Sequence, residues 1–85
     1  MTTKPRRVEG IELEQIAEGF MVHQPERERV HYLNHTAAIV LELCDGERDE
    51  DAIAHELQDL YELTEAPHAE VAACLASLRE EQLIV

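Results

Sequence analysis

The chain has 85 residues, of which 45% are hydrophobic, and a formal net charge of -12 at pH 7. The apolar fraction excludes a disordered acidic chain, and three glycines and three prolines are too few for a fibrous or low-complexity one. A domain of this size buries only about 60% of the surface that its unfolded chain exposes. We therefore expect one folded domain whose small core leaves little room for a deep catalytic cavity.

The charge is concentrated in the carboxyl-terminal part of the chain. Residues 34–85 hold 13 acidic and two basic side chains, whereas residues 1–10 hold one acidic and three basic ones. An acidic surface repels nucleic-acid phosphates and anionic membranes. Neither is therefore expected as a partner, and a basic peptide or a basic protein surface is the better candidate.

Two features predict a cytoplasmic protein. Cys44 and Cys74 each lie in an apolar stretch, which is typical of reduced thiols packed in a core. The basic residues near Met1 are not followed by the apolar segment of a secretory signal, and no apolar run approaches the roughly 18 residues of a membrane helix.

The first ten residues show no hydrophobic pattern, so a flexible N-terminal arm is expected over residues 1–10. No linker long enough to separate two domains follows, and the chain has no internal repeat. The remaining residues, 11–85, are expected to form a single domain.

Three short apolar runs predict strands. Ile11, Leu13 and Ile16 approach the two-residue alternation of a half-buried strand. Two further runs, at 20–22 and 30–33, are separated by a proline and a charged turn. Three short strands joined by tight turns predict an antiparallel meander.

From Asn34 onward the apolar period becomes helical. Asn34 and Asp49 are expected to cap two helices, Gly46 to follow the end of the first, and Pro67 to begin a third. The order predicts an α+β domain, winged-helix-like, with a three-stranded antiparallel sheet followed by three α-helices. The expected buried faces hold Ala37, Leu41 and Cys44 in the first helix, Ile53, Leu57, Leu60 and Tyr61 in the second, and Val71, Cys74 or Leu75, and Leu78 in the third.

Patterns for catalysis and for metal binding are weak. The only serine, Ser77, has no histidine or aspartate spaced for a triad. His31 and His35 are four apart, but the expected strand becomes a helix between them, so they do not share one helical face. The cysteines form no CxxC pair, the glycines are isolated, and the acidic run 45–51 lacks the spacing of a calcium loop. We expect no enzyme activity, no cofactor and no metal.

A binding module remains. The strand over 30–33 would be the last in the meander, which leaves one edge with unpaired N–H and C=O groups beside the helices. Such edges are templates for the addition of another strand. The alternative is that this edge is not available for pairing, because a helix or the amino-terminal arm covers it or because Arg27 and Arg29 protect it. A proline at His31 is expected to block the addition if the N–H of that residue faces the added strand.

A longer stretch of the chain resembles the PqqD family. The resemblance is carried by Pro25-Glu26, by Tyr32-Leu33-Asn34 and by the apolar helix that ends in Asp45-Gly46, and it covers about residues 18–85. It implies a peptide chaperone, also called a RiPP recognition element, with three strands followed by three helices. Such proteins hold the leader segment of a ribosomally made precursor peptide and present it to a modifying enzyme, often a radical SAM protein.

The resemblance also implies where the peptide binds. In the family the leader adds to the third strand and lies in a groove against the third helix. The implied residues are Val30, His31, Tyr32 and Leu33 in the strand, and Val71, Cys74, Leu75, Leu78 and Arg79 in the helix, which line the groove or support it from the core.

Three positions depart from the family pattern. The first strand reads Ile11-Glu12-Leu13-Glu14 where the family has an arginine and an aromatic residue ahead of an aspartate. Glu70 stands where aspartate is common, and Gln82 stands where glycine is common. These departures favour a peptide-modification pathway other than that of pyrroloquinoline quinone. A winged-helix DNA-binding regulator and a structural subunit of an enzyme complex stay as alternatives, and the expected state is a monomer or an edge-paired or swapped dimer.

Overall fold

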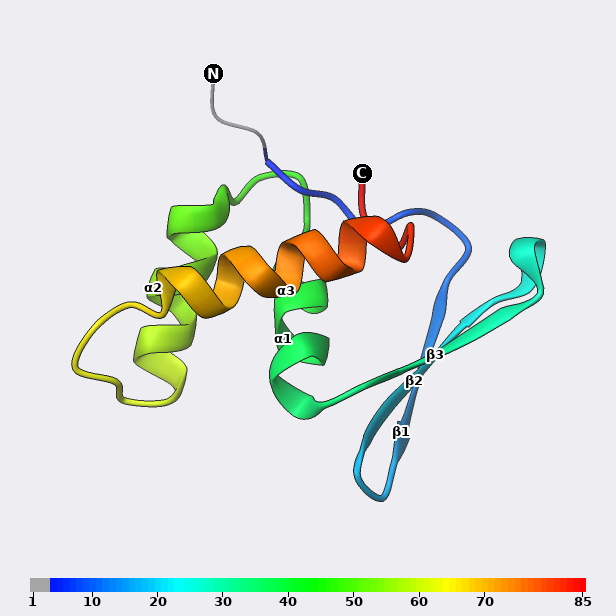
Figure 1. Cartoon of the computed structure of the whole chain (residues 1–85), viewed down its shortest axis with the longest axis horizontal. Helices are drawn as coiled ribbons and strands as arrows, with labels where there is room; N and C mark the ends of the chain where they lie inside the picture. Colours follow the sequence, from blue (N-terminus) through cyan, green and yellow to red (C-terminus); the bar gives the residue numbers. More distant parts are fainter. Residues whose placement is uncertain (1–3) are drawn as a thin grey trace.

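The computed structural model describes residues 4–85 and confirms the α+β order of three strands followed by three helices. The elements are β1 (Glu12–Ile16), β2 (Gly19–Gln24), β3 (Arg29–Leu33), α1 (His35–Leu43), α2 (Glu50–Leu60) and α3 (His68–Glu80). The sheet is antiparallel in the order β1-β2-β3 and lies at one end of the molecule, while α3 crosses α1 and reaches α2 at the other end (Figure 1). Both outer strands of the sheet are therefore edges.

β2 is longer than its apolar run predicts. The run ends at Val22, but His23 and Gln24 continue the strand because they pair with Val30 and Arg29 of β3. A short 3-10 turn, η1 (Pro25–Arg27), then reverses the chain. Pairing with a neighbouring strand, rather than hydrophobicity, sets where β2 ends.

The predicted caps of the first two helices are confirmed. The Asn34 side chain accepts a hydrogen bond from the N–H of Ala37 at 2.8 Å, and the Asp49 side chain accepts one from Ala52 at 2.8 Å. Pro67 is the cap residue of α3 and not its first helical residue, because the helix begins one position later. The chain therefore enters α3 without a side-chain cap.

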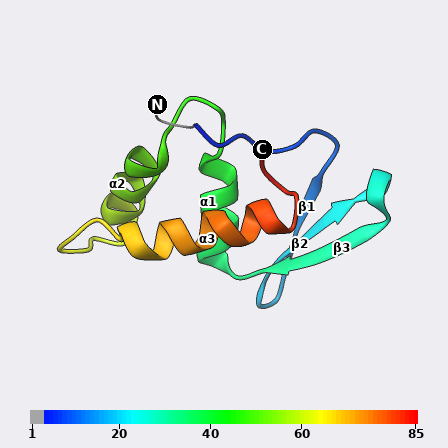
Figure 2. The ribbon, with the colours of Figure 1, turned by 45° about the horizontal axis from the view of Figure 1, so that its top comes forward.

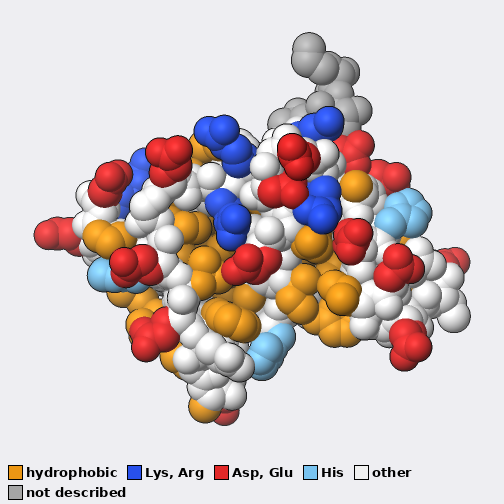
Figure 3. All heavy atoms as spheres, turned by 180° about the vertical axis from the view of Figure 1, so that it is seen from behind, with side chains coloured by type: hydrophobic (Ala, Val, Ile, Leu, Met, Phe, Trp, Pro, Cys, Tyr) orange, Lys and Arg blue, Asp and Glu red, His pale blue; other side chains and the backbone are white. Residues whose placement is uncertain are grey.

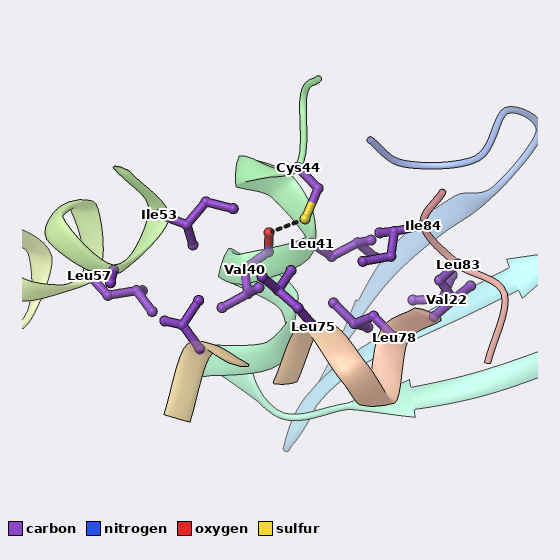
Figure 4. Packing of buried hydrophobic residues seen from close by; sticks show 12 residues of the cluster. Val22, Val40, Leu41, Cys44, Ile53, Leu57, Leu75, Leu78, Leu83 and Ile84 are labelled. Atoms are coloured by element: carbon purple, nitrogen blue, oxygen red, sulfur yellow. Dashed lines mark hydrogen bonds between the residues drawn. The ribbon is translucent and has the colours of Figure 1, made fainter. Parts of the chain in front are cut away.

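Helices and sheet meet in one hydrophobic core. Buried side chains from the three helices point toward one another, and Val22 of β2 and Ile84 of the carboxyl-terminal segment join them (Figure 4). Leu41 is fully buried at the centre, and the thiol of Cys44 donates a hydrogen bond to the carbonyl of Val40 at 3.1 Å. This core fixes where α3 lies relative to the sheet.

Two residues predicted on the buried face of α2 are exposed. Leu60 is 58% exposed and Tyr61 is 44% exposed, whereas Ile53 and Leu57 of the same helix are buried. The last turn of α2 extends past the level at which α3 crosses it (Figure 1), so none of the helices within residues 4–85 covers that turn. The helical period is right for Leu60 and Tyr61, but no described element packs over them.

The amino-terminal segment corrects the expectation of a flexible arm over 1–10, of which residues 1–3 lie outside the described residues. Pro5 is fully buried, and Arg6 exchanges backbone hydrogen bonds with Val85 at 3.2 and 2.8 Å. The N–H groups of Arg7 and Val8 donate to the carbonyls of Cys44 and Leu83, both at 2.9 Å. Backbone hydrogen bonds to distant parts of the chain hold this segment against the domain. Such bonds do not produce a hydrophobic period in the sequence, so the pattern did not reveal them.

The acidic run at 45–51 serves local structure. The Asp45 carboxylate accepts hydrogen bonds from the N–H groups of Glu47 at 2.9 Å and Arg48 at 3.1 Å. The hydrogen bond from the N–H of Glu47, with the second from Arg48, lowers the pKa of this half-buried carboxyl. Because the folded state depresses the pKa, this contribution to stability is present above the ordinary carboxyl range and is lost as the pH falls through the lowered pKa.

The surface combines scattered carboxylates with apolar areas. Seen from behind, hydrophobic side chains gather in the middle of the face, acidic ones lie around it, and basic ones lie in its upper part (Figure 3). Over residues 4–85, none of the helices has the length and the apolar character needed to traverse a bilayer.

Candidate functional site

The outer edge of β3 is an open backbone surface beside the helices. β3 pairs with β2 on one side, no other described strand pairs with its opposite side, and the strand runs directly into α1 (Figure 2). An unpaired edge presents N–H and C=O groups that another strand can bind. The edge predicted from the sequence is therefore present.

The sheet register decides which backbone groups point outward from β3. Ile16 and Gly19 pair across a two-residue turn, so their backbone groups bond each other. Orientation alternates along a strand, so the backbone of Gly19 faces β1 and that of Phe20 faces β3. Continuing the alternation, Val22 of β2 also faces β3.

Applied to β3, the same alternation separates its residues into two groups. His31 is opposite Val22 and Leu33 is opposite Phe20, so the backbones of both face β2. The N–H and C=O groups of Val30 and Tyr32 consequently point to the free edge. Of the strand residues predicted from the sequence, these two carry the outward backbone groups.

The side chains of the same residues divide between the two faces of the sheet. Val30 is 46% exposed and Tyr32 is 73% exposed on the outer face. Leu33 packs against the core from the inner face, and only 11% of the His31 side chain is exposed. An added strand would therefore find apolar side chains on the outer face and a polar contact on the inner one.

A polar network joins β3 to the end of α3. The buried amide of Gln24 donates to the carbonyl of Gln82 at 3.2 Å, and its oxygen lies 2.9 Å from Nε2 of His31. Nδ1 of His31 is 3.0 Å from the carboxylate of Glu81, and Arg27 bonds the Gln82 side chain. These contacts hold the carboxyl end of α3 against the inner face of β3.

Gln82 occupies a strained backbone position in this network. Its φ is +63°, in the left-handed region that favours glycine. This conformation is a physical reason why the pattern described above has glycine at this position. In this chain the side-chain oxygen of Gln82 accepts a hydrogen bond from Arg27.

The five predicted residues of α3 do not share one environment. Val71, Leu75 and Leu78 are buried core residues, with at most 3% exposure. Cys74 is half-buried at the margin of the core, and Arg79 is exposed. The first three can support a groove only from beneath, which leaves Cys74 and Arg79 as the predicted helix residues that are open to contact.

Both thiols are free, as predicted, and their burial predicts slow chemistry. Desolvation, with a smaller effect of Cys74, raises the pKa of Cys44 from 9.0 to about 11, and desolvation also raises that of Cys74. At about pH 8 we expect Cys74 to react with a disulfide reagent before Cys44, and both thiols to react more slowly than they do in urea. Equal rates for both thiols would contradict this order.

The raised thiol pKa values also predict how stability depends on pH. Because folding raises both pKa values, the free energy of unfolding should fall as the pH rises from 9.0 toward about 11.

Sequence reasoning missed Gln24 and Glu81. Gln24 is the last residue of β2 and Glu81 follows the last residue of α3, and neither belongs to an apolar period or to a motif. They meet through His31, which lies seven positions from Gln24 along the chain but opposite the end of α3 in space. Only the tertiary arrangement joins them.

These features define a small α+β domain that presents an open sheet edge beside a helix. The chain matches the family model of the coenzyme PQQ synthesis protein D (PqqD) over residues 19–84. It belongs to the PqqD family, which confirms the resemblance seen in the sequence.

A solved structure has the same fold. A chain described as "Lasso peptide synthetase B1 complexed with the leader peptide" superposes with a TM-score of 0.75 and 23% identity, over 96% of this chain and 98% of that chain. At this identity the likeness concerns the fold. A search of curated proteins gives no match.

Proposed function

We propose that this protein binds the leader segment of a ribosomally synthesised precursor peptide by strand addition to β3. The observation that carries the proposal is the free edge at Val30 and Tyr32, whose backbone groups point away from β2. Membership of the PqqD family supports it, as does the shared fold of a protein whose structure holds a leader peptide.

The chemistry of strand addition suits this edge. Each backbone hydrogen bond contributes about 0.5–1.5 kcal/mol net, so a few bonds supply modest affinity whatever the peptide sequence. Side chains of the added strand alternate between the two faces and supply selectivity. On one face they would meet Val30 and Tyr32, and on the other the space beside Cys74 and α3.

The proposal includes a partner enzyme that modifies the bound peptide, of the radical SAM class that the family resemblance implies. This chain would act without catalysis of its own, in the cytoplasm, where its free thiols stay reduced. A DNA-binding role has little support, because α2 carries no Lys or Arg and α3 carries only Arg79.

The outward orientation of the Tyr32 backbone allows a direct test. A proline at this position removes an N–H that points to the free edge and not to β2, and edge strands tolerate proline at such positions. We expect Tyr32→Pro to fold and to weaken binding of a fluorescently labelled cognate leader peptide by at least about tenfold. His31→Pro is unsuitable, because the register turns that N–H toward β2 and its loss would break the sheet.

The matched control is Gln15→Pro on the other edge strand. Gln15 is opposite Phe20, so its N–H also points away from β2, and its side chain is exposed. We expect this variant to bind the peptide as the parent does. Unchanged binding by a folded Tyr32→Pro variant would overturn the proposal. Loss of binding in Gln15→Pro alone would also overturn it and would indicate that the peptide pairs with β1.

A further inference from the structure

A cavity lined by arginines lies at the end of the sheet where η1 joins β2 to β3. Its volume is about 410 Å³, and its walls are the amino-terminal segment over 6–11, η1 with the end of β2, and the carboxyl-terminal segment (Figure 2). Three of the seven Lys and Arg residues of the chain line it, namely Arg6, Arg7 and Arg27. The cavity therefore concentrates positive charge in a chain whose formal net charge is -12.

Two of these arginines are available to an acidic ligand. Arg7 is 3.2 Å from the carboxylate of Glu42, so its charge is already paired. Among the described residues, neither Arg6 nor Arg27 has a carboxylate partner, and Arg27 bonds the neutral side chain of Gln82. Both arginines are exposed, and a guanidinium presents N–H donors in a planar fork that matches a carboxylate. The cavity therefore suits a carboxylate side chain.

Two glutamates moderate the positive charge of the cavity. Glu9 and Glu26 belong to its lining, and neither forms an ion pair with a described arginine. The Glu26 carboxyl lies against the backbone of Gly10, since a Cβ added there would be 3.9 Å from its Cδ and Oε1 atoms. The arginines of the lining outnumber its glutamates, so the lining keeps a net positive charge. Removal of one glutamate should strengthen its attraction for an anion.

This cavity adjoins the end of β3 at which a bound strand would leave the sheet. Arg27 precedes Arg29, the first residue of β3, by two positions, so their Cα atoms lie within about 8 Å of each other. An antiparallel strand on the free edge of β3 runs opposite to β3, so its carboxyl-terminal flank leaves the edge beside Arg29. Antiparallel pairing is also the slightly more stable arrangement per residue. The flank therefore passes two exposed arginines.

We infer that this cavity is a subsite for an aspartate or glutamate side chain of the bound peptide, located about two to four residues after the residue opposite Arg29. The inference rests on the proposed function. An extended chain advances about 3.3 Å per residue, so this spacing covers the distance from the start of β3 to Arg27. Local attraction at this end of the sheet would select an acidic flank even though the net charge of the chain repels anions.

Three exposed charged residues allow a matched test. Arg27→Glu turns a cation of the lining into a carboxylate. Lys4→Glu makes the same change of charge in the amino-terminal segment, at a residue that does not line the cavity. Glu26→Gln removes an opposing carboxylate with almost no change of shape, so it tests the same charge from the opposite sign. All three variants are expected to keep the circular dichroism spectrum of the parent.

The probe is a peptide of about 16 residues selected from a random displayed library on the parent chain, then synthesised with aspartates, asparagines or lysines in the flank after the strand-pairing segment. We expect the parent and Lys4→Glu to bind the aspartate version about 3- to 10-fold more tightly than the asparagine version. Arg27→Glu should lose this preference and favour the lysine version, and Glu26→Gln should increase the preference. At about 1 M salt, where the Debye length is about 3 Å, the preference should shrink.

The outcomes separate this inference from the proposed function. Equal binding of the three versions by the parent, or an aspartate preference that persists in Arg27→Glu, would overturn the subsite and leave strand addition standing. Peptides that bind Tyr32→Pro as well as the parent would overturn strand addition and the subsite together. A preference for acidic residues before the strand-pairing segment, and not after it, would reverse the direction of the bound strand and would also overturn the subsite.

Discussion

Replacing Gly19 with alanine is expected to lower the free energy of unfolding by about 2–4 kcal/mol. A Cβ at this position would lie 2.3 Å from the carbonyl oxygen of Leu33 and 3.3 Å from Cα of Asn34, both backbone atoms. Its φ of +149° is a conformation that residues with side chains rarely adopt. Relief of the clash must move the end of β3 or the start of α1, so the bond between Phe20 and Leu33 would weaken.

Gly10→Ala is the control for backbone strain without a clash. Gly10 also has a positive φ, +80°, but an added Cβ would meet only the Glu26 side chain at 3.9 Å. We expect a loss of about 1 kcal/mol there, measured by urea denaturation followed by circular dichroism. Equal losses of unfolding free energy in the two alanine variants would contradict the prediction, because they would show that the clash with the Leu33 carbonyl adds nothing to the backbone strain.

Leu41→Ala is expected to remove about 2–5 kcal/mol of stability, the cost of a cavity in a packed core. Leu41 has no exposed surface and belongs to the buried core, where it lies beside Ile84 of the carboxyl-terminal segment (Figure 4). A domain of this size is stable by only about 4–13 kcal/mol. The single change therefore consumes a large share of the total, and a lower denaturation midpoint with an unchanged slope is the expected signature.

Leu60→Ala is the matched control for this core prediction. Leu60 is a leucine in a helix like Leu41, but it is 58% exposed. We expect the exposed substitution to change stability by no more than about 0.5 kcal/mol. A loss below about 1 kcal/mol for Leu41→Ala would mean that the helices repack around the missing side chain.

Local patterns predicted much of the fold. The two helix caps at Asn34 and Asp49 were recognisable because a side-chain oxygen followed by a helical period is a short-range signal. The buried faces of α1 and α3 followed the same period, and Leu41, Val71 and Leu75 lie in the core as expected. Where the covering element was missing, as at the last turn of α2, the period alone misplaced Leu60 and Tyr61.

The candidate site was predictable only as a segment. Apolar residues at 30–33 indicated an edge strand, but they did not show that Val30 and Tyr32, rather than His31, direct their N–H groups outward. That distinction comes from the two-residue turn between Ile16 and Gly19, which sets the register across the whole sheet. A one-residue change in that register would exchange the inward and outward groups.

The sequence by itself determined the family, the element order and most of the core, because caps and apolar periods act between residues that are near in the chain. Tertiary structure alone decided the rest. It placed Pro5 and Arg6 against the carboxyl-terminal segment, joined His31 to Glu81 across 50 positions, and brought Arg6 and Arg27 to one cavity. These contacts join residues that are distant in the chain, and backbone bonds and polar pairs of that kind leave no period by which to find them.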